Sequence, residues 1–119
     1  MSSTVIRQQS DSRLSRIVTH NGIVYLAGLT ADDRSAGMKA QTEEVLKKID
    51  DLLELAGTDK RCDLSVTVYV SDMRLKPQMD EAWIAWVDSS NTPVRACVET
   101  RLGTADTLVE IVVIAAQLA

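Results

Sequence analysis

The last quarter of the chain places charged residues in segments that otherwise look like buried strands. Glu110 interrupts a run of Leu, Val, Ile and Ala that is typical of a strand buried on both faces. An unpaired buried carboxylate is costly, so Glu110 must have a partner, a proton or a wet cavity beside it. In such a place it could hold and activate one water molecule. A salt-bridged or interface Glu is an equally good interpretation of the sequence.

Arg95 and Cys97 lie two positions apart in a second short segment, so on a strand they share one face. The planar guanidinium of Arg95 matches a substrate carboxylate and can hold it through two hydrogen bonds. The simpler alternative is a surface or interface ion pair, with Glu99 or Asp106 as the partner. Glu99 also shares the face of Arg95 and could orient its side chain.

Cys97 is most simply a small buried apolar residue. No Lys or His lies near it in the sequence to activate the thiol. The single histidine, His20, stands beside a predicted turn and is best explained as a turn-flanking residue. A Cys–His nucleophile pair stays open as an alternative, because one sequence does not show which residues meet in space.

The elements that must position these residues begin with a hairpin. Residues 14–20 and 23–28 flank Asn21 and Gly22, the pair that most favours a two-residue type I′ turn. Residues 4–9 could add an edge strand beside this hairpin. We therefore expect the chain to open with three strands.

Two helices are predicted in the middle of the chain. Residues 29–37 are small and polar, as in a loop, and residues 38–56 carry apolar side chains at the spacing of a helix with one buried face. Gly57 is a natural stop for that helix. A second helix should begin near Pro77, which suits the first turn. Its apolar stripe is formed by Met79, Ala82, Trp83, Trp86 and Val87, and the two tryptophans fit helix core or subunit contacts better than a cofactor site.

Three further strands complete the expected order, β-β-β-α-β-α-β-β, which is an α+β arrangement. They cover residues 63–71, 94–102 and 108–117. Residues 63–71 alternate between apolar and polar side chains, with Leu64 expected on the apolar face. The polar face is mixed rather than strongly charged, so it could line an oligomer interface.

Composition limits the classes of function. The 119 residues suit one domain, residues 1–119, and 45% apolar residues are ample for a core. No apolar run reaches the ~20 residues that span a bilayer, and no signal peptide begins the chain, so a cytoplasmic protein is expected. The two cysteines form no disulfide framework, and nothing has metal-ligand spacing. The net charge of −4 without a basic cluster argues against nucleic-acid binding.

A family resemblance runs through residues 14–116. Residues 93–99 (PVRACVE), followed about ten residues later by an apolar strand with one Glu, resemble the Rid (RidA/YjgF) family of imine deaminases. Other segments agree, in the order found in that family: 21–28 (NGIVYLAG), 41–46 (QTEEVL), 53–57 (LELAG) and 67–73 (TVYVSDM).

The resemblance implies a fold, an assembly and a reaction. The fold would be chorismate-mutase-like (YjgF-like), with two helices on one face of a six-stranded mixed sheet. The assembly would be a homotrimer with sites in the clefts between subunits. The reaction would be hydrolytic deamination of 2-imino acids or enamines, such as 2-iminobutanoate and 2-iminopropanoate, to 2-oxo acids and ammonia, with no metal and no cofactor.

The resemblance also assigns roles to residues. The carboxylate-binding Arg of the family falls on Arg95, and its water-positioning Glu falls on Glu110. Gly28 matches a Gly that presents its backbone to the substrate carboxylate, although it could merely end a strand. Cys97 matches a pocket-lining Cys rather than a nucleophile, and Ser15 matches a site Ser only weakly.

Three positions depart from the family pattern and alter the expected pocket wall. Leu14 stands where many members have Tyr, Leu29 stands where a Gln follows the Gly, and Asp80 stands where an Asn is common. These changes point to a different or bulkier substrate. Two alternatives therefore stay open: a pathway-specific deaminase, such as one for 2-aminomuconate, and a non-catalytic trimeric protein that binds carboxylates or acts like a chaperone.

Overall fold

The computed structural model describes residues 4–118, which form one six-stranded sheet and two α-helices. The strands lie in the order β1-β2-β3-β6-β4-β5, and only β4 and β5 are parallel neighbours. The mixed sheet and the α+β class predicted from the sequence are confirmed. The elements are β1 (Ile6–Ser10), β2 (Ser15–His20), β3 (Ile23–Leu26), α1 (Met38–Leu55), η1 (Lys60–Cys62), β4 (Asp63–Val70), η2 (Met73–Leu75), α2 (Lys76–Trp86), β5 (Val94–Glu99) and β6 (Val109–Ala116).

The β2–β3 hairpin closes on the predicted turn. Asn21 and Gly22 have φ angles of 52° and 78°, and His20 pairs with Ile23. Both central residues of a type I′ turn need positive φ, which Asn and Gly tolerate better than other residues. The turn therefore fixes the register of β2 against β3.

Helix α1 ends as its sequence indicates. Gly57 follows the C-cap with a φ of 79°, and its amide donates to the carbonyl of Glu54. The Thr58 amide donates to the carbonyl of Leu53, which completes a Schellman motif. The helix ends at Leu55, one residue earlier than predicted.

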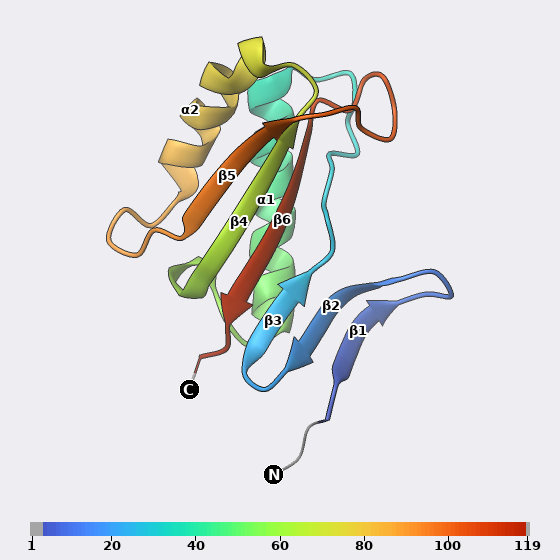
Figure 1. Ribbon diagram of the computed structural model, residues 1–119, viewed down its shortest axis with the longest axis vertical. Coiled ribbons are helices and arrows are strands. Elements are labelled where there is room, and N and C mark those ends of the chain that lie inside the picture. Colours follow the sequence, from blue (N-terminus) through green and yellow to red (C-terminus); the bar gives the residue numbers. More distant parts are fainter. Residues whose placement is uncertain (1–3, 119) are drawn as a thin grey trace.

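Both helices cover the same face of the sheet (Figure 1), as the resemblance implied. Met79, Ala82 and Trp83 of α2 are buried, whereas Trp86 and Val87 are partly buried against the core. The core between the helices and the sheet is made of aliphatic side chains at the spacing of each element. Its largest fully buried members are Ile17, Met38, Leu46, Ile49, Leu53, Met79 and Ile111.

Strand β4 corrects one detail of the predicted alternation. Val66, Val68 and Val70 are buried as expected, but Leu64 is exposed and Asp63 is buried. The register between β4 and β6 shifts between Asp63 and Ser65, which is the signature of a bulge. The extra residue reverses the alternation at the start of the strand.

The other face of the sheet has no helix over it (Figure 1). Along β6 the residues facing the helices are buried, while Glu110, Val112, Ile114 and Ala116 between them are only half-buried. Strand β6 is thus buried on one face and partly open on the other, rather than buried on both. Among the described residues, no helix is long and apolar enough to cross a membrane.

Candidate functional site

Gly28 and Glu110 are neighbours at the end of the hairpin. A short bridge joins Leu29 to Ile111 through two backbone hydrogen bonds of 3.0 and 3.1 Å. The bridge holds Gly28 so close to Glu110 that a Cβ at position 28 would lie 2.5 Å from Oε2 of Glu110. Real Cβ atoms do not approach an oxygen so closely, so glycine at position 28 leaves room for the carboxylate.

The carboxylate of Glu110 is half-buried on the open face of the sheet, opposite Tyr69 of β4. Within residues 4–118 it makes no hydrogen bond or ion pair, and the amide of Gly28 beside it makes none either. Both groups are therefore available to water or a ligand. The cost of placing a carboxylate in this otherwise apolar strand is thus reduced by partial solvent access to Glu110 rather than by a salt bridge.

Arg95 lies on β5 beside α2. It pairs with buried Val66, so its side chain projects from the face that the helices cover. Its Nη1 donates to Oδ1 of Asp80 at 2.9 Å, and its guanidinium lies 5.2 Å from the centre of the Trp83 ring. The carboxylate and the aromatic face together fix the direction of the guanidinium.

Asp80 joins two cations. Its other oxygen, Oδ2, accepts a 2.7 Å hydrogen bond from Nζ of Lys76 one helical turn earlier. Burial acts to raise the pKa of Asp80, but the hydrogen bonds from Lys76 and Arg95 outweigh it and hold this pKa below its usual value. Two cations and one carboxylate leave the cluster with one positive charge, so it can still attract an anion.

The ion-pair partner proposed from sequence for Arg95 was wrong. Glu99 accepts a 2.8 Å hydrogen bond from the amide of Met73. Asp106 lies 3.6 Å from Arg34. Asp80 is 15 positions away on another element, and no local pattern connects it to Arg95.

Cys97 follows Arg95 on the same face and packs partly buried against the core. Burial raises the pKa of its thiol, and the charges of Lys76 and Arg95 oppose this only in part. His20 lies in β2, far across the sheet order, where its ring contacts the Thr4 carbonyl and the Asn21 amide. The structure thus does not bring the thiol and the imidazole together.

Arg95 and Glu110 project from opposite faces of the sheet. Arg95 pairs with Val66 and therefore faces the helices. Glu110 pairs with Tyr69, which alternates with the buried residues of β4 and faces the open side. The candidate residues thus form two groups in one chain, Gly28 with Glu110 and Arg95 with Cys97.

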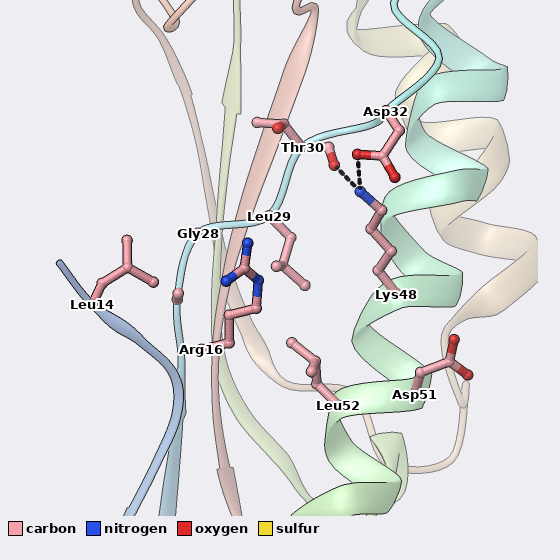
Figure 2. Close-up of a pocket in the computed structure, with 10 residues that line it drawn as sticks. Leu14, Arg16, Gly28, Leu29, Thr30, Asp32, Lys48, Asp51 and Leu52 are labelled. Carbon is pink, nitrogen blue, oxygen red and sulfur yellow. Dashed lines mark hydrogen bonds and ion pairs between the residues drawn. The ribbon is translucent and has the colours of Figure 1, made fainter. Parts of the chain in front are cut away.

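A pocket of about 420 Å³ opens beside Gly28, between the hairpin and α1 (Figure 2). Ser15 is outside its lining, with its Oγ 2.8 Å from Oγ of Ser10. Arg16 projects into the pocket, although it was not among the site residues predicted from the sequence. A single cation next to a buried strand residue is the sequence signal that could have identified it. The lining residues are Leu14, Arg16, Ala27, Gly28, Leu29, Thr30, Asp32, Lys48, Asp51 and Leu52.

Within residues 4–118, no group of three or more His, Cys, Asp or Glu side chains is arranged to hold a metal ion. The chemistry on offer in the described part of the chain is a free carboxylate, a free backbone amide and a cationic cluster. These are the parts of an acid–base and anion-binding site.

Comparison with known proteins decides the family. Residues 6–117 match the family profile described as Endoribonuclease L-PSP. The chain belongs to this family, which includes the YjgF, Rid and RutC proteins. A RutC family protein of Haemophilus ducreyi is 39% identical over 112 residues, which cover 94% of this chain and 96% of that protein. The RutC family protein YoaB of Escherichia coli K12 is 34% identical over 113 residues, covering 95% and 98%.

The fold of the family is shared as well. The crystal structure of a YjgF-family protein from Neisseria meningitidis superposes with a TM-score of 0.92 at 34% identity, covering 98% of each chain. The resemblance to the Rid family that the sequence motifs indicated is therefore confirmed, and so is the YjgF-like fold.

Proposed function

We propose that this protein hydrolyses reactive 2-imino acids or enamines, of the 2-iminobutanoate and 2-iminopropanoate type, to 2-oxo acids and ammonia. The observation that carries the proposal is the unpartnered Glu110 carboxylate beside Gly28. A half-buried carboxylate with partial access to solvent and no protein partner among the described residues is suited to act as a general base. Membership of a family that includes Rid proteins supports the same reaction.

The reaction can be followed atom by atom. Arg95 and the free amide of Gly28 hold the substrate carboxylate, and Glu110 takes a proton from a water molecule. The oxygen of that water attacks the C=N carbon, and Glu110 passes the proton it took to the nitrogen, which gives an adduct with one hydroxyl and one amino group; Glu110 then moves the hydroxyl proton to the amino group. When the C–N bond breaks, ammonia leaves and a 2-oxo acid remains. Positioning and one general base supply roughly 10²–10⁴-fold, which suffices for imines that already hydrolyse quickly in water.

The opposite orientation of Arg95 and Glu110 fits a site shared between subunits. In a homotrimer, the open sheet face of each chain and its edge strands meet neighbouring copies, so Arg95 of one subunit can approach Glu110 of the next. The half-buried, mixed character of Glu110, Val112 and Ile114 supports this, because an interface suits such a surface better than water does.

The test generates imines in place with an amino-acid oxidase and follows the surviving imine with semicarbazide. We expect the protein to speed imine loss, and we expect Arg95→Ala and Glu110→Gln to remove the acceleration. Arg74→Ala is the matched control, because Arg74 pairs with Asp72 at the surface. Activity that survives in both site variants would contradict the proposal. Carboxylate binding without turnover in the wild type would favour a binding protein instead.

The name of the matched family profile suggests RNA cleavage as another activity. The net charge of −4 does not favour it, because RNA binding relies on cationic surfaces. An RNA degradation assay on the same preparation should therefore show no cleavage that depends on Glu110.

A further inference from the structure

The pocket beside Gly28 has apolar walls and one uncompensated cation. Leu14 before β2, Leu29 after β3 and Leu52 of α1 supply aliphatic surface. In Figure 2 the guanidinium of Arg16 extends from β2 beside the Gly28–Leu29 segment. Pockets with mostly apolar walls and a few polar groups orient small ligands by those polar groups.

The other charges of this pocket are already paired. Nζ of Lys48 lies 2.9 Å from Oδ1 of Asp32 and donates to the carbonyl of Thr30 at 2.8 Å (Figure 2). Asp51 forms a 2.6 Å ion pair with Lys47 outside the pocket. Lys48 also lies 3.5 Å from Oε2 of Glu44, so it has no spare positive charge to offer, and the attraction of the pocket for an anion depends on Arg16.

The side chain of Arg16 makes no hydrogen bond or ion pair in the part of the chain that the structure describes, whereas its carbonyl accepts a 2.9 Å hydrogen bond from the amide of Ala27. Asp11, in the preceding turn, is a carboxylate that senses the charge of Arg16. Backbone hydrogen bonds from Leu14 and Arg13 lower the pKa of Asp11, and Arg16 contributes the smallest part. Asp11 is therefore held by the turn, and the guanidinium stays free.

We propose that Arg16 binds a second anionic group, so that the substrate is an imino acid whose side chain ends in a carboxylate or a similar anion. This inference rests on the proposed function and specifies its substrate class. The aliphatic walls contact the methylene groups, and Arg16 reaches the distal anion. The reacting end of the substrate then lies toward Gly28, the pocket residue whose Cα faces the Glu110 carboxylate.

The experiment compares two stable product analogues by isothermal titration calorimetry, 2-oxoglutarate with two carboxylates and 2-oxobutanoate with one. The wild type should bind 2-oxoglutarate roughly 5–10-fold more tightly, which is the range of one charge-assisted contact. Arg16→Gln should abolish this preference and leave 2-oxobutanoate binding within about twofold. Arg16→Lys, which keeps the charge, should retain part of it. Arg13→Gln, an exposed arginine of the same turn outside the pocket, should behave as wild type.

A wild type without preference for 2-oxoglutarate, or a preference that persists in Arg16→Gln, would overturn the inference. Equal loss of both ligands in Arg16→Gln would overturn it too, because it would indicate a general structural effect. The titration needs no turnover, so it judges Arg16 even if no imine is hydrolysed. Parallel turnover of the imines derived from glutamate and alanine judges the proposed function separately.

Discussion

Arg95 and Glu110 belong to β5 and β6, yet their side chains leave opposite faces of the same sheet. No rotamer change brings two such groups to one small ligand within a single chain. A site that uses both must therefore be completed by a second copy of the chain.

Mixing two inactive variants tests this arrangement. Arg95→Ala and Glu110→Gln should each be inactive, whereas co-refolded mixtures should regain up to about a quarter of wild-type activity. In the proposed site, Arg95 comes from one subunit and Glu110 from another. When equal amounts of the two variants assemble at random, about half of the subunits in each position carry the intact residue, so about one site in four has both. The control is a mixture of the two folded variants whose subunits have not exchanged, which should stay inactive. Mixtures that stay inactive, although mass spectrometry shows mixed oligomers, would place both residues of a working site in one chain.

The hydrogen bond that Arg95 donates to Asp80 leads to a second prediction. Asp80 occupies one side of the guanidinium and competes with an incoming carboxylate. Asp80→Asn should keep a hydrogen-bonding side chain, remove the competing charge and lower the Kd for 2-oxobutanoate by roughly 3–10-fold.

Calorimetric titration measures this change, and Glu81→Gln is the matched control. Glu81 is the next residue of α2 and forms only an exposed 3.7 Å pair with Lys39. A higher Kd in Asp80→Asn, with Glu81→Gln unchanged, would mean that Asp80 chiefly orients Arg95.

Gly28 offers a third prediction, because an added methyl group would displace a carboxylate rather than backbone. Gly28→Ala should lower kcat for imine hydrolysis about tenfold or more, since Oε2 of Glu110 must move away from its position. Thermal unfolding should change little, because the end of a Glu side chain is flexible. Gly103→Ala is the control, where an added Cβ meets nothing within 4 Å. Unchanged kcat in Gly28→Ala would argue against a precise role for Glu110.

Local signals made much of the fold predictable. Asn21 and Gly22 specify their turn through backbone conformation alone, and Gly57 ends α1 for the same reason. Leu64 was misplaced because a bulge depends on how β4 pairs with β6, and the partners of Asp63 and Ser65 there are Ala115 and Ile114, far away in the chain. Pairing partners of that kind are invisible to an alternation pattern.

The candidate site was predictable residue by residue but not as an arrangement. Arg95 and Glu110 stand out because charge in a buried strand is costly. Their opposite orientation depends on which face the helices cover, and that is a tertiary property. Asp80 was noted only as a departure from the family, since nothing in a helix pattern reveals its contact with β5.

Asp63 is a buried carboxyl group outside the candidate site. It is 6% exposed, and neither of its oxygens has a hydrogen-bond partner within the described residues. Burial, with smaller contributions from the charges of Asp50 and Asp59, raises the pKa of Asp63 to about 7, although Lys60 acts in the opposite direction. At pH values between its ordinary pKa of 3.8 and about 7, Asp63 is therefore protonated in the folded protein and ionised in the unfolded chain.

This difference predicts how stability depends on pH. The contribution of Asp63 is fully present below its ordinary pKa of 3.8 and is lost as the pH rises through about 7, because only the folded state keeps the proton. Asp63→Asn cannot ionise, so it should be more stable than wild type at pH 8 by roughly 1–3 kcal/mol and nearly equal to it at pH 4. Urea unfolding at fixed protein concentration across this pH range measures the difference. Glu54→Gln, which removes an exposed carboxylate of α1, should show no such trend. A constant difference between Asp63→Asn and wild type from pH 4 to pH 8 would mean that Asp63 does not titrate in this range.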